Sequence, residues 1–109
     1  MSFDETKDVV AGIIREECMN QGYNVKQLIL FGSRASGEFT TDSDWDFVAI
    51  LDRQIDWKQK MKIWLPINRR LGKLRVDADV LLKSEDDFES ERNDTGKVLY
   101  YAYKNVIVA

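Results

Sequence analysis

The order of apolar and polar residues along this chain predicts alternating helices and strands. Between Asp4 and Gln21 the apolar residues recur at helical spacing, and Gly22 is a typical helix stop. From Leu74 to Leu82 apolar and polar residues alternate strictly, which is the period of a strand. Over the chain, the pattern predicts helices at 4–21, 56–72, 84–92 and 97–104, strands at 28–31, 44–51, 74–82 and 106–109, and a turn at 93–96.

The predicted helix from Asp56 to Gly72 has most of its large apolar residues near one stripe, which is expected to pack on a sheet. Pro66 predicts a kink or a break near Leu65, because proline removes a backbone hydrogen bond and clashes with the preceding turn. The basic residues of this segment are interpreted as a solvated face, and contact with phosphate or with an acidic partner is the alternative. The stripe consists of Trp57, Met61, Trp64, Leu65, Asn68 and Leu71, its tryptophans being interpreted as core or as a partner surface.

The composition is that of a folded protein and excludes several kinds of chemistry. A chain of 109 residues with 44% hydrophobic residues is expected to form one domain over residues 1–109. It has no histidine, which removes histidine metal ligands, histidine bases and Ser-His-Asp hydrolysis, so its acid–base chemistry must depend on carboxylates. A formal net charge of -3 gives no strong footprint for nucleic acid.

The expected location is the cytoplasm. Cys18 is the single thiol, so no internal disulfide can form. No apolar run is long enough for a membrane span, and the N-terminus does not resemble a secretory signal.

Two pairs of aspartates lie on predicted strands. Asp44 and Asp46 point to the same face of one strand, and Asp77 and Asp79 repeat that arrangement on a later strand. Carboxylates this close repel one another, and a divalent cation would offset the repulsion. Mg²⁺ is the expected ion because it prefers oxygen ligands and is commonly held by one or two carboxylates together with substrate phosphates.

A Gly-Ser turn precedes the first pair of aspartates. Gly32 lets the backbone approach a ligand closely, and the Ser33 hydroxyl with neighbouring N–H groups can hold a phosphate oxygen. Ten residues separate Ser33 from Asp44. This spacing of Gly-Ser and Asp-x-Asp, with the run Gly-Ser-Arg-Ala, resembles the signature of the nucleotidyltransferase superfamily that includes DNA polymerase beta, and in particular its minimal nucleotidyltransferase domains.

The resemblance implies both a fold and a reaction. The fold is α+β with two layers, a small mixed sheet with helices packed on one face, as in the polymerase beta palm. The reaction is a two-metal transfer of an NMP group, AMP from ATP or its equivalent from another nucleoside triphosphate, to a hydroxyl of a protein or a small molecule. Asp44 and Asp46 hold two Mg²⁺ ions, and Asp79 is the third carboxylate and helps take the hydroxyl proton. Asp77 is the rival for that third position, since it lies on the same face of its strand.

The remaining residues of the signature have implied roles as well. Gly32 and Ser33 cradle the triphosphate, and Arg34 either contacts a phosphate oxygen or pairs with Glu38. Two positions depart from the family pattern. Ser36 replaces a second basic residue, which predicts weaker triphosphate affinity, and Trp45 fills an aliphatic position between the aspartates, which predicts altered packing behind the metals.

The resemblance also implies a partner, because minimal nucleotidyltransferases are commonly paired with a small helical protein of the HEPN class, including in toxin–antitoxin systems. The first hypothesis is therefore an enzyme that moves AMP or another NMP onto a protein or small molecule. The second is a binding module or antitoxin subunit that masks a HEPN-type partner by contact. A homo-oligomer is compatible with either hypothesis.

Overall fold

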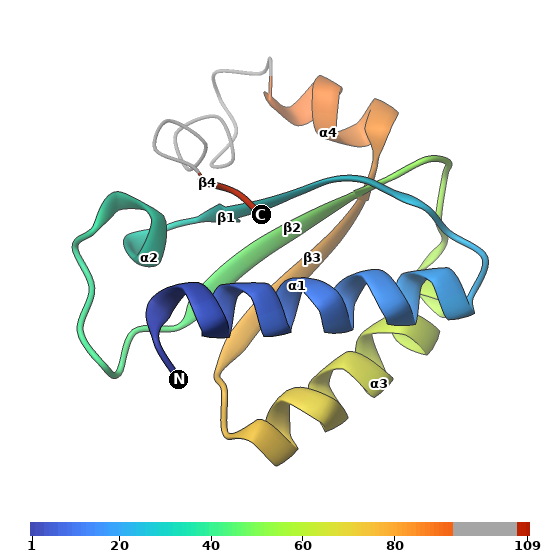
Figure 1. Cartoon of the computed structure of the whole chain (residues 1–109). Helices are drawn as coiled ribbons and strands as arrows, with labels where there is room; N and C mark the ends of the chain where they lie inside the picture. The colour runs from blue at the N-terminus through green and yellow to red at the C-terminus, as the bar shows by residue number, and fades with distance from the viewer. Residues whose placement is uncertain (93–106) are drawn as a thin grey trace.

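The computed structural model describes residues 1–92 and 107–109 (Figure 1). The predicted turn at 93–96 and helix at 97–104 lie outside these residues. In the described part of the chain, no helix has the length and apolar character needed to cross a bilayer. The elements in chain order are α1 (Phe3–Asn20), β1 (Val25–Phe31), α2 (Ser33–Ser36), β2 (Trp45–Leu51), α3 (Trp57–Leu74), β3 (Ala78–Ser84), α4 (Glu85–Arg92) and β4 (Ile107–Val108).

The strands form one mixed sheet in the order β3-β2-β1-β4, which confirms the predicted fold class. β1 pairs antiparallel with β2 and with β4, whereas β2 and β3 run parallel. The parallel pair is joined by α3, as a crossover connection requires. Because β2 and β3 run in the same direction, their N-terminal ends lie side by side. The predicted aspartates lie at or next to these strand ends.

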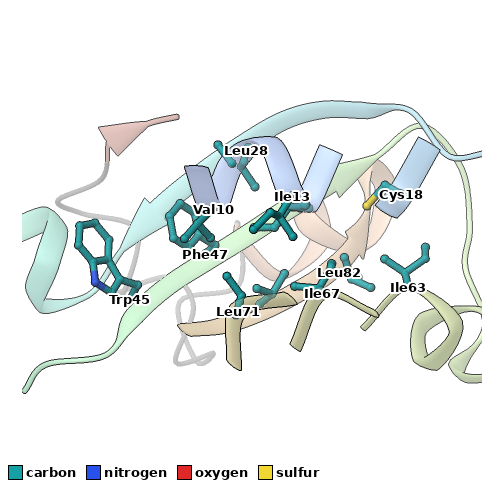
Figure 2. Close-up of a cluster of buried hydrophobic side chains, with 14 of the residues drawn as sticks. Val10, Ile13, Cys18, Leu28, Trp45, Phe47, Ile63, Ile67, Leu71 and Leu82 are labelled. Atoms are coloured by element: carbon teal, nitrogen blue, oxygen red, sulfur yellow. The ribbon is translucent and has the colours of Figure 1, made fainter. Parts of the chain in front are cut away.

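The two faces of the sheet are covered differently (Figure 1). α1 and α3 pack on one face and enclose the main core, part of which is drawn in Figure 2. A smaller cluster of Ile29, Val48, Ile50 and Phe88 lies on the opposite face, where Phe88 comes from α4. The sequence predicts a helix cap at Ser84, which is followed three residues later by Asp87. The Oγ of Ser84 accepts a hydrogen bond from the Asp87 N–H at 3.1 Å, so this cap is present. Main-core side chains with almost no exposed surface include Val10, Ile14, Cys18, Leu28, Leu30, Phe47, Leu51, Ile63, Ile67 and Leu71.

Pro66 does not break α3, so of the two predicted outcomes, a kink or a break, the break is wrong. The helix is continuous from Trp57 to Leu74. Ile63 before the proline and Ile67 after it are both fully buried in the main core. Burying an aliphatic side chain contributes about 1.5 to 3 kcal/mol. Burial on both sides of Pro66 therefore offsets one missing backbone hydrogen bond.

The end of α3 also differs from the prediction. The helix passes Gly72 and ends at Leu74, and the capping residue Arg75 has a left-handed φ of 57°. The Arg75 N–H donates to the Gly72 carbonyl and the Val76 N–H to the Leu71 carbonyl, both at 3.1 Å. Together these two bonds form a helix C-terminal motif. β3 consequently begins at Ala78 and not at the predicted position 74.

The side of α3 that packs on the sheet is not the predicted stripe. Ile63, Ile67 and Leu71 form the buried side, at spacings of four residues. Trp57, Met61, Trp64 and Leu65 are exposed instead. α3 has apolar residues on two sides, and the sequence pattern alone does not show which of them meets the sheet. Leu71 is the one member of the predicted stripe that is fully buried.

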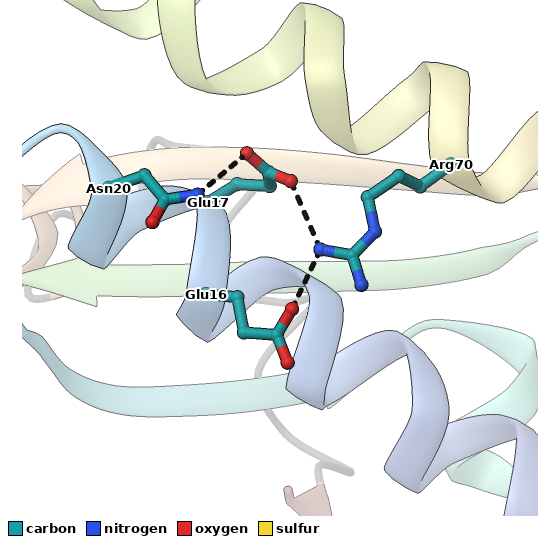
Figure 3. Close-up of polar contacts among 4 residues, drawn as sticks. All are labelled: Glu16, Glu17, Asn20 and Arg70. Carbon is teal, nitrogen blue, oxygen red and sulfur yellow. Dashed lines mark hydrogen bonds and ion pairs between the residues drawn. The ribbon is translucent and has the colours of Figure 1, made fainter.

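Two ion pairs of Arg70 connect α3 to α1 (Figure 3). Arg70 donates to a carboxylate oxygen of Glu16 at 2.8 Å and to one of Glu17 at 3.0 Å. Asn20 donates to the other oxygen of Glu17 at 3.4 Å. These surface contacts join α1 and α3 beside the main core that the two helices share.

Candidate active site

Asp46 and Asp79 are direct neighbours in the sheet. Asp46 is the second residue of β2, and its register partners are Phe31 on β1 and Asp79 on β3. Neighbouring strands lie about 4.8 Å apart, and register partners in a parallel pair point to the same face. The flanking residues Trp45 and Phe47 belong to the main core, so Asp46 and Asp79 point to the opposite face of the sheet.

Burial is the largest of three effects that raise the pKa of Asp46, and the charges of Asp79 and Asp44 raise it further. Asp46 is half-buried, whereas Asp44 and Asp79 are exposed. The fold therefore places Asp46 beside Asp79, and the charge of Asp44 also acts on Asp46. Asp77, the rival of Asp79, is not among the charges that act on Asp46, and its carbonyl accepts the Trp45 N–H at 3.0 Å.

Gly32 lies against the Asp46 carboxylate. Its φ of 74° is left-handed, and a Cβ built at this position would overlap Oδ2 of Asp46 and lie 3.3 Å from its Cγ. Glycine is therefore required here both for the backbone conformation and for the close approach. The Gly32 carbonyl accepts from the N–H groups of Ala35 and Ser36, which starts the short helix α2 at the half-buried Ser33.

Arg34 is held by the loop that leads to Asp44. Its guanidinium donates to the Ser43 carbonyl at 3.0 and 3.2 Å and to the Thr41 carbonyl at 3.4 Å. Its Cζ lies 4.6 Å from the ring centres of both Phe39 and Trp45. In this structure Arg34 contacts the loop and not Glu38, and its contact with phosphate stays a prediction.

The sequence interpretation did not predict that aromatic side chains pack against the Arg34 guanidinium. Trp45 stacks on Phe47 at 6.4 Å and meets Phe3 at 4.9 Å, and Phe3 also stacks on Phe39 at 5.6 Å. Trp45 thus contacts α2 through Arg34 and α1 through Phe3, and the packing change predicted from its position between the aspartates stays a prediction. An arginine near two aromatic residues was the available signal, since guanidinium groups stack readily on such rings.

The donor set has the chemistry that Mg²⁺ prefers, because all of its groups are carboxylate or hydroxyl oxygens. Asp44, Asp77 and Asp79 also line a shallow hollow of about 330 Å³ next to Gly72. However, within residues 1–92 and 107–109 no group of three or more Asp, Glu, Cys or His side chains is arranged so that it could hold a metal ion. The sheet thus brings Asp46 and Asp79 together without gathering a complete ligand set.

The chain matches a sequence model of the family described as "Polymerase beta, Nucleotidyltransferase" over residues 13–105. It is 50% identical over 30 residues to the protein adenylyltransferase MntA of Aphanizomenon flos-aquae (strain 2012/KM1/D3). That local match spans 28% of this chain and 20% of the MntA protein.

Two solved structures share the fold. One is a crystal structure of a toxin–antitoxin with AMP-PNP, with a TM-score of 0.57 and 17% identity over 89% of this chain and 69% of the other. The second is a Sulfolobus solfataricus protein provisionally assigned as a nucleotidyltransferase, with a TM-score of 0.55 and 17% identity over 99% of this chain and 86% of the other. At these identities the two structures support the fold alone.

Proposed function

This chain belongs to the polymerase beta family of nucleotidyltransferases as a minimal nucleotidyltransferase domain, and from that premise we propose that it transfers a nucleotidyl group from a nucleoside triphosphate to an acceptor hydroxyl. The observation that carries the proposal is the register of Asp46 with Asp79, on adjacent parallel strands beside the glycine turn. Two carboxylates on one sheet face beside a phosphate-compatible turn suit phosphoryl chemistry.

Each residue has a defined task in the proposed reaction. Gly32 and Ser33 cradle the triphosphate, where the first N–H groups of α2 have no partner within the helix. Asp79 accepts the proton of the acceptor hydroxyl while the oxygen of that hydroxyl forms a bond to the α-phosphorus. The bond from the α-phosphorus to the bridging oxygen then breaks, and pyrophosphate leaves.

Asp44, Asp46 and Asp79 would hold the Mg²⁺ ions. When bound, such ions neutralise the triphosphate charge and lower the pKa of the attacking hydroxyl. Asp44 and Asp79 are exposed, so their side chains are free to change rotamer and complete a ligand set around the half-buried Asp46. The raised pKa of Asp46 supports this proposal, since a cation relieves the crowding that raises it.

We propose AMP as the transferred group and a helical protein of the HEPN class as the partner. The adenylyltransferase name of the MntA relative supports the choice of AMP. The toxin–antitoxin assembly and the AMP-PNP of the structural neighbour support an adenine nucleotide and a protein partner. We further propose a cytoplasmic location, on the basis of the composition described above.

A binding module with little turnover is the second candidate function. The observation that favours it is the lack, among the described residues, of a group of acidic, Cys or His side chains able to hold a metal ion. The contacts of Arg34 also favour this candidate, because its guanidinium already donates to the Ser43 and Thr41 carbonyls of the loop. In this case the domain would mask its partner by contact alone.

Two measurements distinguish these candidates. The first is Mg²⁺-dependent binding of AMP-PNP, and the second is transfer of label from ATP labelled at the α-phosphate to proteins of a cell extract. Wild type is compared with Asp46→Asn and with Asp8→Asn, a matched change on the exposed surface of α1. We expect Asp46→Asn to lose both activities and Asp8→Asn to keep both. Transfer that survives Asp46→Asn would overturn the site, and absence of both activities in wild type would favour the binding module.

A further inference from the structure

The outer side of α3 carries an apolar stripe that the fold leaves uncovered. Trp57, Met61, Trp64 and Leu65 are 71%, 39%, 38% and 48% exposed. Their spacing of four, seven and eight residues places them on one side of the helix, distinct from the side formed by Ile63, Ile67 and Leu71. Single exposed apolar residues are normal, but a contiguous stripe with two tryptophans is typical of an interaction site.

The stripe borders the free edge of the sheet. β3 is an edge strand of the sheet, and among the described strands only β2 pairs with it. Met61 and Trp64 line a hollow of about 290 Å³ with β3 residues that include the exposed Leu81. Unprotected edges next to apolar side chains promote association with other chains. We call the surface formed by the stripe and the adjoining edge of β3 the α3–β3 groove.

The groove has a positive rim. Lys58, Lys60 and Lys62 lie between the apolar residues of the stripe, and no ion pair or hydrogen bond of their side chains occurs within the described residues. Lys83, at the β3 side, is instead paired with Glu91 at 2.9 Å. Three uncompensated cations on a chain whose net charge is -3 form a local patch of opposite sign.

We propose that the α3–β3 groove binds a helix of a partner protein whose apolar side chains are flanked by acidic residues. The stripe is a helical surface with ridges that suit a second helix, and the three lysines select acidic flanks. A second copy of this chain does not offer such a helix in α4, because the apolar Phe88 of that acidic helix is buried. Nucleic acid is disfavoured because the formal net charge of the chain is -3, and its binding is one of the alternatives measured below.

The proposal is tested with two labelled helical peptides and the full chain. Both peptides have the same Leu and Trp stripe, flanked by Glu in one and by Lys in the other, and binding is followed by fluorescence anisotropy. We expect the Glu peptide to bind at least about tenfold more tightly, with the preference reduced at high salt. Met61→Ser is expected to weaken binding about tenfold, while Met19→Ser, at an exposed methionine of α1, leaves it unchanged. Replacing Lys58, Lys60 and Lys62 by Gln is expected to remove the preference for Glu without loss of fold.

Several results would overturn the proposal. One is equal affinity of the chain for the two peptides. Another is an equal loss of affinity for the Glu peptide in Met61→Ser and in Met19→Ser. Self-association that Met61→Ser abolishes would assign the groove to a second copy. Tighter, Met61-dependent binding of single-stranded RNA, or of vesicles of phosphatidylcholine and phosphatidylserine in equal amounts, would assign it to those ligands. None of these measurements depends on nucleotidyl transfer, so the groove and the proposed reaction can fail separately.

Discussion

Gly32 lies directly against the Asp46 carboxylate in the candidate site. A Cβ at position 32 would overlap Oδ2 of the half-buried Asp46, so that carboxylate would have to move. The turn and the acidic strand are therefore one structural unit. A substitution in the turn should change the position of a carboxylate on another element, and this consequence can be separated from simple backbone strain.

Gly32→Ala and Gly37→Ala provide that separation. Both glycines have a left-handed φ, 74° and 85°, but a Cβ at position 37 would meet nothing within 4 Å. We expect Gly37→Ala to lower the free energy of unfolding by about 1 to 2 kcal/mol, the cost of a left-handed backbone for a residue with a Cβ. Gly32→Ala should lower it by more, because ψ of -156° at Gly32 is a conformation found essentially only in glycine and its Cβ would also overlap Asp46. Only Gly32→Ala should also lose Mg²⁺-dependent binding of AMP-PNP. Urea unfolding and equilibrium titration measure the two effects, and equal binding by both variants would contradict the coupling.

Asp46→Asn should stabilise the metal-free protein at neutral pH. Burial, followed by the charges of Asp79 and Asp44, raises the pKa of Asp46 above its unfolded value. The folded state therefore binds more protons just above the ordinary carboxyl range, and the free energy of unfolding falls as pH rises through the pKa. At neutral pH the ionised Asp46 is unfavourable, and asparagine removes that cost.

The advantage of the variant should shrink as pH falls through the carboxyl range, because wild-type Asp46 then becomes protonated. Urea unfolding at several pH values in the presence of a chelator measures it, with Asp8→Asn as the control. Added Mg²⁺ should stabilise wild type more than Asp46→Asn. A stability difference that does not change with pH would mean that carboxylate crowding is not its cause.

Among the helices and strands, local signals were reliable where one residue decides the structure. Ser84 capped α4 as predicted, and the Gly-Ser turn with its Asp-x-Asp strand identified the family, which the family match confirms. The register of Asp46 with Asp79 could not be predicted, because it depends on the parallel pairing of strands far apart in the sequence. The site roles of these residues stay predictions.

The errors concern α3, where tertiary packing overrides local preference. Pro66 stayed within the helix because burial on both sides outweighs its cost. Gly72 did not end the helix, and Arg75 took the left-handed position that glycine usually fills. The expected core stripe is mostly exposed because a second apolar side packs on the sheet. Sequence periodicity detects apolar sides but does not rank them.

Arg75→Gly should therefore stabilise the protein. Arginine at a φ of 57° is strained by its Cβ, and the side chain is exposed. Glycine at this position should raise the free energy of unfolding by up to about 1 kcal/mol. Arg69→Gly, at an exposed position inside the same helix, should instead lower it by about 1 kcal/mol. Thermal and urea unfolding of both variants test this opposition, and a loss of stability with Arg75→Gly would show that its side chain contributes contacts.

The sheet, α1 and α3 share one main core, and Cys18 lies inside it with no exposed surface. Burial, with a smaller effect of Glu17 and a partial opposition from Arg15, raises the pKa of this thiol to about 12. Because the thiolate is the reactive form, native Cys18 should be almost inert to thiol reagents at mildly alkaline pH. Its reaction should then report the opening of the core.

The rate of Cys18 modification should measure global unfolding. We expect the rate to rise with urea with the same slope as the equilibrium free energy of unfolding, as for a group exposed only in the unfolded state. A chain with Cys18→Ala and Met19→Cys is the control, since position 19 is 59% exposed and should react at once. Bound Mg²⁺ and AMP-PNP should slow Cys18 modification without contacting Cys18, because a ligand that binds the folded state lowers the unfolded population. A fast reaction with a weak urea dependence would instead mean that the end of α1 opens separately from the sheet, and the two long helices would then not form one cooperative unit.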